Sequence, residues 1–408
     1  MPRCESETHL ADTTVHLAHV PNKFLIKSSR TIIWTTRAGL VVQHSRSQKK
    51  DFFYRGDTMQ ESILYQGKKI QGHAGLVHER PRTYVEALDA RIETYMAKLR
   101  DFEVRCSMPD ADKEPLLDEI TMLNDSMLQA CAQFEEEVND PLALKQAQVY
   151  FREKTHPLLS KSYLINRCRT WPQGHQGDFM TLELAYKNIP MSEGIGSYLD
   201  KYLLSTTLGD GVRDRIEKMR SLLKEELISR NNPQVLDVAC GSCREVFELA
   251  PEIKTSGAKF TCVDLDPAAL EFALDRFAYA GLTEEHTELI QYNALRMFDI
   301  EMAQTEFGKQ DVIYSIGFFD YLPDDFLTKL LNSLYLLLNP GGKLFASFKD
   351  ADRYRPELFH WLVDWDGFLQ RNEKDFLKVF QDADIPSSAL SMTRVDSGSI
   401  VFYSITKQ

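Results

Sequence analysis

A short acidic segment in the C-terminal half of the chain has the residue types of a cofactor loop. The apolar run 235–238 contains Asp237 and is followed by the small residues 239–243, before a helix predicted from Arg244. In an open α/β sheet, ligands bind at the carboxyl ends of strands, where such turns lie. Small residues let the backbone approach a ligand closely, and the Asp237 carboxylate can accept a hydrogen bond from a cationic amine.

The next apolar run ends in two further acids, Asp264 and Asp266, about one strand–helix unit beyond Asp237. A carboxylate at this place can accept hydrogen bonds from both hydroxyls of a ribose, as in other nucleoside-binding α/β folds. The repeated order of strand, acid, turn and helix therefore predicts a nucleoside-containing cofactor. The alternative is an αβα domain without catalysis, because one fold hosts many functions.

The glycine pattern of the loop distinguishes between cofactors. A dinucleotide site needs G-x-G-x-x-G, so that a pyrophosphate can sit on the helix N-terminus. The corresponding positions hold Ala239, Gly241 and Arg244, so only one glycine is present. This disfavours NAD and FAD.

The same loop resembles motif I of the class I methyltransferases, with Asp237 in the acidic position and Ala239, Gly241 and Cys243 at the three glycine positions. The resemblance implies S-adenosylmethionine as the cofactor and a Rossmann-like, mostly parallel sheet. It also implies the cofactor contacts further along the chain. These are the ribose hydroxyls on Asp264, with Asp266 beside it, the adenine amine at Asn293 and Ala294, and the methionine part at Ser315 and Gly317.

A narrower resemblance covers roughly residues 145–408. Residues 171–179, 314–322, 364–365 and 370–372 are similar to a bacterial group whose named members make methyl esters of 3-hydroxy fatty acids as extracellular signals. This resemblance implies a bacterial methyltransferase that acts on a small-molecule carboxylate.

A loop upstream of the sheet carries Gly174, Gly177 and Asp178. We expect it to fold over the cofactor, with Asp178 as a further cofactor-binding residue and the helical region as a lid that excludes water. The alternative is an ordinary turn between helices. Arg213 and Arg215 could bind a carboxylate of cofactor or substrate, although such residues more often lie on a solvated helix face.

Three residues are predicted to be catalytic. Asp320 and Tyr321 follow the fourth strand, where the methyl group should face its acceptor, and either could orient or deprotonate that acceptor. His360 is a candidate base, although a single histidine is more often structural. The neighbouring Phe318 and Phe319 either contact the sulfonium through their rings or pack in the core.

Cys240 and Cys243 form a C-x-x-C pair at the start of a helix. Such pairs serve redox or metal chemistry in other proteins. A zinc site needs four ligands, and no second pair has suitable spacing, so we predict no metal site. The overlap with motif I favours coincidence over redox function.

The elements that position these residues divide the chain into three zones. We expect a small β-rich segment over residues 1–80, a helical lid over 81–230 and the cofactor-binding domain over 231–408. The fold class is α/β, in which the predicted strands alternate with helices to form a parallel sheet. A final hairpin adds the closing antiparallel strand. The strands are expected at 235–238, 259–263, 289–291, 311–315 and 343–348, and the hairpin at 391–395 and 400–405.

Composition limits the function classes. A net charge of −12 disfavours a nucleic-acid partner. The chain has no run of about 18 uncharged apolar residues that would predict a membrane span, and its first 20 residues do not form a secretory signal. Its seven cysteines are scattered over 408 residues and indicate reduced thiols, so we expect a cytoplasmic enzyme. A homodimer through the N-terminal or helical region stays open.

The expected reaction is in-line transfer of the sulfonium methyl group to a carboxylate, which is already ionised and needs no strong base. The alternatives are cleavage or cyclisation of the cofactor with release of methylthioadenosine, methylation of a protein docked on residues 1–80, and cofactor binding without turnover.

Overall fold

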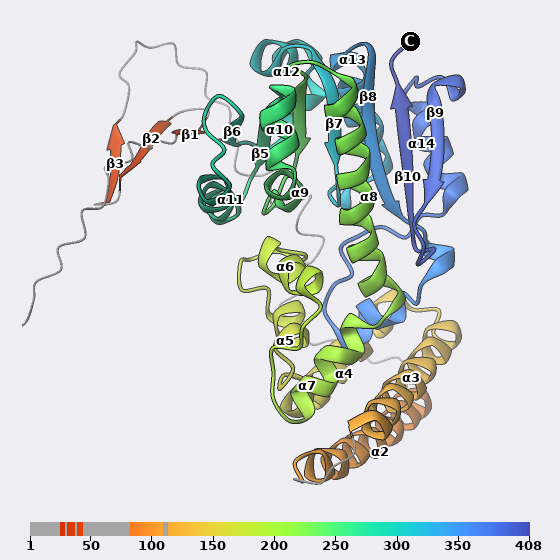
Figure 1. The fold of residues 1–408 in the computed structure, drawn as a ribbon. Coiled ribbons are helices and arrows are strands. Elements are labelled where there is room, and N and C mark those ends of the chain that lie inside the picture. The colour runs from red at the N-terminus through yellow and green to blue at the C-terminus, as the bar shows by residue number, and fades with distance from the viewer. Residues whose placement is uncertain (1–24, 29–30, 37–38, 44–81, 109–112) are drawn as a thin grey trace, which may run out of the picture.

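The computed structural model describes residues 25–28, 31–36, 39–43, 82–108 and 113–408. A twisted sheet with helices on both faces occupies one part of the molecule, and a layer of helices from α2 to α7 lies beyond one end of its central strands (Figure 1). The long helix α8 runs from that layer along the sheet. This arrangement confirms the predicted α/β class with a helical region before the cofactor-binding domain.

The ten described strands form one sheet in the order β3-β2-β1-β6-β5-β4-β7-β8-β10-β9. Neighbours from β1 through β8 in this order pair in parallel, whereas β10 pairs antiparallel with β8 and β9. The predicted closing hairpin is therefore confirmed. The strands are β1 (Leu25–Ser28), β2 (Thr31–Thr36), β3 (Gly39–Gln43), β4 (Gln234–Val238), β5 (Lys259–Asp264), β6 (Thr287–Gln291), β7 (Gln310–Ser315), β8 (Leu338–Lys349), β9 (Leu390–Arg394) and β10 (Ile400–Thr406).

The helices fall into a lid group and a sheet-flanking group. The lid group contains α2 (Arg82–Cys106), α3 (Lys113–Glu137), α4 (Pro141–Leu159), α5 (Tyr163–Thr170), α6 (Phe179–Lys187) and α7 (Ile195–Leu204). The flanking group contains α8 (Thr207–Ser229), α9 (Arg244–Glu248), α10 (Ala250–Ser256), α11 (Pro267–Ala280), α12 (Ile300–Phe307), α13 (Asp324–Leu337) and α14 (Glu373–Asp382). None of the described helices is long and apolar enough to cross a membrane.

Local sequence explains where the central elements begin and end. Helix α8 stops at Ser229, four residues before Pro233, and Asn232 takes a left-handed φ of 50° that turns the chain into β4. In β4 every residue after Gln234 is buried, which is typical of a strand covered by helices on both faces. The Asp266 side chain caps α11, and Pro267 occupies its first turn.

Two elements differ from the sequence-based expectation. Strand β8 already begins at Leu338, five residues before the expected start at Lys343, and its pairing with β7 contains a register shift between Gln310 and Val312. Residues 338–342, which precede the expected strand, are therefore part of an irregular strand. The expected β-rich segment contributes the strands β1, β2 and β3, but β1 pairs in parallel with β6, so these strands extend the main sheet. The rest of the predicted 1–80 segment (1–24, 29–30, 37–38 and 44–80) lies outside the described residues, and the three-domain division stays a prediction.

Candidate functional site

The loop after β4 keeps a glycine-like backbone although two of its glycine positions are substituted. Ala239, Gly241 and Cys243 have φ values of 58°, 55° and 46°. The left-handed conformation costs a non-glycine residue roughly 1–2 kcal/mol, so Ala239 and Cys243 each have an intrinsically unfavourable backbone conformation. Strain of this kind persists where the surrounding structure supports it, most often at functional sites.

Asp264 ties this loop to β5. Its carboxylate accepts hydrogen bonds from the backbone N–H of Gly241 and of Asp266, both at 2.8 Å. The Tyr292 N–H donates to the Asp264 carbonyl at 2.8 Å, which brings the turn containing Asn293 and Ala294 beside the same strand end. The predicted ribose and adenine residues thus share one edge of the sheet, at the carboxyl ends of β5 and β6.

Buried polar atoms without hydrogen-bond partners among the described residues gather along this edge. They include both carboxylate oxygens of Asp237, Oδ2 of Asp266 and Oγ of Ser315. Burial and the nearby Glu245 raise the pKa of Asp237 well above its ordinary value. A buried acceptor left without a donor costs free energy, so these atoms suit a ligand that carries ammonium and hydroxyl donors. S-adenosylmethionine has both, and the residues present therefore fit this cofactor.

Residues 171–187, here called the lid segment, lie directly against the cofactor loop. Glu183 of α6 is 1% exposed and accepts hydrogen bonds from Ser242 Oγ at 2.7 Å, Arg244 Nη1 at 3.1 Å and Arg276 Nη1 at 2.7 Å. A Cβ on Gly241 would stand 3.8 Å from Cβ of Phe179. Nothing in the sequence near Glu183 pointed to this role, because its partners come from distant helices.

A second contact of the lid segment reaches the predicted ribose site. His175 Nε2 lies 3.8 Å from Oδ2 of Asp266. This contact raises the pKa of His175 and lowers the pKa of Asp266. The upstream loop does fold over the cofactor-binding edge, as its glycines suggested.

Asp178 lies within that loop but faces its own helix. Its carboxylate caps α6 through the Thr181 N–H at 3.0 Å, accepts from Thr181 Oγ1, and binds Arg167 Nη2 at 2.6 Å. These bonds hold the lid segment in shape. Direct contact of Asp178 with the cofactor stays a prediction.

Two of the three predicted catalytic residues, Asp320 and Tyr321, lie in the 3-10 helix Phe319–Tyr321 that follows β7. Asp320 is 2% exposed and accepts hydrogen bonds from Lys349 N at 3.0 Å and Lys349 Nζ at 2.5 Å. The Tyr321 hydroxyl accepts a hydrogen bond from Trp365 Nε1 at 2.7 Å, and burial raises the Tyr321 pKa above its ordinary value. Phe319 is fully buried in the core against Phe348.

The third predicted catalytic residue, His360, lies among the helices of the lid group. Its ring Nδ1 is 3.3 Å from Glu135 of α3, and its carbonyl oxygen accepts a hydrogen bond from Arg152 of α4. These contacts fit the structural alternative for His360, whereas its role as a base stays a prediction.

Arg215 corrects the preferred expectation of a solvated helix face. It is 2% exposed on α8, its Nη1 lies 3.8 Å from Asp320 Oδ2, and its Nε and Nη1 have no hydrogen-bond partner among the described residues. The reason is that α8 packs along the sheet, so this position faces inward. Arg213 binds the carbonyl oxygen of Leu204 and pairs with Asp210.

The C-x-x-C pair is buried in the loop. Burial raises the pKa of Cys240 and of Cys243 well above its ordinary value, and Cys243 has ligand-type atoms of Asp237 and Cys262 within 4.8 Å. Nucleophilic and metal-binding chemistry both need the thiolate form, which this environment disfavours.

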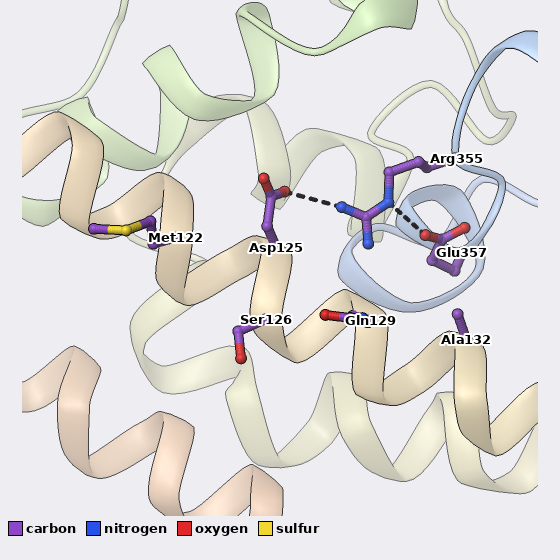
Figure 2. A pocket seen from close by; sticks show the side chains of 7 residues that line it. All are labelled: Met122, Asp125, Ser126, Gln129, Ala132, Arg355 and Glu357. Atoms are coloured by element: carbon purple, nitrogen blue, oxygen red, sulfur yellow. Dashed lines mark hydrogen bonds and ion pairs between the residues drawn. The ribbon is translucent and has the colours of Figure 1, made fainter.

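A surface hollow of about 570 Å³ lies elsewhere, between α3 and the segment around Arg355 (Figure 2). The Arg355 guanidinium donates hydrogen bonds to Glu357 at 2.6 Å and to Asp125 at 3.2 Å, so both acids satisfy its charge. The hollow is lined by Met122, Asp125, Ser126, Gln129, Ala132, Arg355 and Glu357. None of these is a predicted site residue, which separates this hollow from the edge described above.

The region that contains the cofactor loop matches a known protein domain. Residues 236–344 match the family model described as a methyltransferase domain. No curated protein matches the chain.

Several solved structures are similar in fold at low identity. A possible exported protein from Bordetella parapertussis is 18% identical with a TM-score of 0.47, covering 81% of this chain and 99% of that one. Magnesium protoporphyrin IX methyltransferase from Synechocystis PCC 6803, with bound SAH, is 14% identical with a TM-score of 0.38, covering 49% and 87%. An O-methyltransferase family protein from Burkholderia thailandensis is 16% identical with a TM-score of 0.38, covering 51% and 62%.

The family match begins inside β4 and ends inside β8, so it contains the cofactor loop and the strand ends that carry Asp264, Asn293 and Ser315. Residues 236–344 are therefore a methyltransferase domain, and the unpartnered polar atoms of Asp237, Asp266 and Ser315 fit the cofactor of an S-adenosylmethionine-dependent methyltransferase.

Proposed function

We propose that the enzyme transfers the methyl group of S-adenosylmethionine to the carboxylate of a small-molecule acid, forming a methyl ester. The observation that carries this proposal is the engagement of Asp320. Its two carboxylate oxygens accept hydrogen bonds from the backbone N–H and from the Nζ of Lys349, so this carboxylate already has hydrogen-bond partners. An alcohol or phenol acceptor would need a base at this place, whereas a carboxylate is ionised at neutral pH.

The surroundings of Asp320 support the same conclusion. Tyr321 accepts a hydrogen bond from Trp365, and burial raises its pKa, so at neutral pH its hydroxyl is a neutral hydrogen-bond donor. The lid segment also packs against the cofactor loop, where Ser242 and Arg276 donate hydrogen bonds to Glu183. Exclusion of water strips the acceptor carboxylate of solvation, and methyl transfer to it then depends mainly on positioning.

Product analysis with a panel of acceptors tests the proposal. The full-length protein is incubated with S-adenosylmethionine and fatty or hydroxy acids, each matched by the corresponding alcohol, amide and amine. We expect S-adenosylhomocysteine to form with the acids and not with the matched alcohols, amides or amines. Methylthioadenosine as the main product would establish cofactor cleavage instead, and methyl transfer only to proteins would establish a protein methyltransferase.

A further inference from the structure

A buried group of two basic side chains and one acidic side chain lies beside the predicted methyl-transfer position. The group consists of Arg215 of α8, Lys349 at the end of β8 and Asp320 in the short 3-10 helix Phe319–Tyr321 that follows β7. The side chains of these three residues are 3%, 6% and 2% exposed, respectively.

The pairing within the group accounts for one of its two cations. Lys349 Nζ is 2.5 Å from Asp320 Oδ2, which is a direct ion pair. Arg215 Nη1 is 3.8 Å from the same oxygen and makes no hydrogen bond to it, and Nε also has no partner among the described residues. A buried guanidinium whose N–H groups lack hydrogen bonds is costly, so Arg215 in this state favours an anion that is bound during function.

The sheet order places this group on the acceptor side of the cofactor. The predicted adenine and ribose residues lie at the ends of β6 and β5, and the predicted methionine position is at Gly317 after β7. A Cβ on Gly317 would stand 3.1 Å from Arg215 Nη2, so the guanidinium lies directly against this position. Lys349 ends β8, which is the next strand beyond β7.

Aromatic rings also border the group. Lys349 Nζ lies 4.5 Å from the ring centroid of Phe368 and 5.5 Å from that of Tyr321, and Tyr321 in turn accepts a hydrogen bond from Trp365. Rings at these distances attract the ammonium and exclude water from the group. The site therefore suits an anion whose other parts are apolar.

We infer that Arg215 is the residue that binds the acceptor carboxylate, with the Lys349–Asp320 pair setting the net charge of the site to +1. This inference rests on the proposed function and names the acceptor subsite. A carboxylate can accept two charge-assisted hydrogen bonds from a guanidinium, and its negative charge brings the group to neutrality. The carboxylate of the cofactor is the other anion that this guanidinium could bind.

Binding measurements on the full-length protein saturated with S-adenosylhomocysteine test the inference. The probes are 3-hydroxydecanoate and the matched 3-hydroxydecanamide, titrated calorimetrically. We expect the wild-type protein to bind the acid at least about tenfold more tightly than the amide, because the charge-assisted bonds exist only for the acid. Arg215→Gln abolishes this preference and leaves the affinity for S-adenosylhomocysteine unchanged, and Arg215→Lys keeps part of it.

Two further variants distinguish charge balance from a purely structural role. Lys349→Met weakens binding of the acid, because Arg215 then becomes the sole counter-ion of Asp320. Asp320→Asn strengthens binding of the acid, because both cations then face the ligand. Loss of acid binding in both variants would indicate only a damaged site and would contradict the charge account.

Other outcomes overturn the inference or separate it from the proposed function. Equal binding of acid and amide by the wild-type protein overturns it. Weaker binding of S-adenosylhomocysteine by Arg215→Gln, with the acid preference retained, assigns the guanidinium to the cofactor and also overturns it. An acid preference that depends on Arg215, without formation of a methyl ester, leaves the anion site standing and refutes the proposed function alone.

Discussion

The guanidinium of Arg215 lies against Gly317 so closely that a Cβ on Gly317 would stand 3.1 Å from Nη2, 3.4 Å from Nη1 and 3.5 Å from Cζ. Gly317 thus provides the space in which α8 delivers a buried cation to the end of β7. Gly317, which was expected to contact the cofactor, therefore lies against Arg215, for which a solvated helix face was expected.

Replacement of Gly317 by alanine should displace the guanidinium by a few tenths of an ångström. We expect Gly317→Ala to raise the KM for the acid acceptor by about tenfold, in line with a loss of roughly 1.4 kcal/mol from a charge-assisted hydrogen bond. Steady-state kinetics at saturating cofactor measure this effect. In an Arg215→Gln background the same substitution should add little, since neighbouring residues that act through one contact are not additive. Equal effects in both backgrounds would show that Gly317 acts independently of Arg215.

Glu183 should stabilise the cofactor loop from the lid side. Glu183 is 1% exposed and forms ion pairs with Arg244 and Arg276, so Glu183→Gln removes the negative charge that balances these two arginines. We expect a loss of stability on the order of 1–3 kcal/mol and weaker binding of S-adenosylmethionine, with kcat at saturating cofactor nearly unchanged. Denaturant unfolding and equilibrium dialysis measure the two effects.

The exposed Glu136 of α3 is the matched control, and Glu136→Gln should change neither quantity. A fall in kcat without any change in cofactor affinity would contradict the role of Glu183 in the loop.

Closure of the lid segment over Asp266 should depend on pH through His175. The pKa of His175 is raised above 6.5 by Asp266, and that of Asp266 is lowered below 3.8 by His175. The contact is therefore complete below pH 6.5 and is lost as the pH rises through the raised pKa of His175. On the acid side it is lost as the pH falls through the lowered pKa of Asp266.

We accordingly expect protection of the lid segment from hydrogen exchange to decrease between mildly acidic and mildly alkaline pH. His175→Asn should show no such decrease. Protection factors of the wild-type lid segment that stay equal across this pH range would refute the contribution of the pair.

The thiols of the cofactor loop should be inert. Cys240 is 8% exposed and Cys243 1%, and burial raises both pKa values. Among the cysteines in the described ranges, Cys106 is the most accessible and should react before the others with iodoacetamide. We expect full activity after the native protein has been alkylated, with mass spectrometry locating the label. Rapid inactivation that tracks modification of Cys240 or Cys243 would revive the redox interpretation.

The sequence predicted the elements whose patterns are local. The strands expected at 235–238, 259–263 and 311–315 appear as β4, β5 and β7, and Asp264 ends β5 as expected. Contacts between distant segments could not be predicted in this way. Arg215 and Arg213 are two residues apart on one helix, yet only the packing of α8 along the sheet decides that Arg215 faces inward. Glu183 and Lys349 gain their roles from partners more than 25 residues away.

The most direct test of the account measures the chemical form of the transferred methyl group. The wild-type protein is given methyl-labelled S-adenosylmethionine and 3-hydroxydecanoate, and the products are then treated with alkali. The account predicts labelled methanol released from an ester in a one-to-one ratio with S-adenosylhomocysteine. Label that survives alkali, or methylthioadenosine in place of S-adenosylhomocysteine, would contradict it.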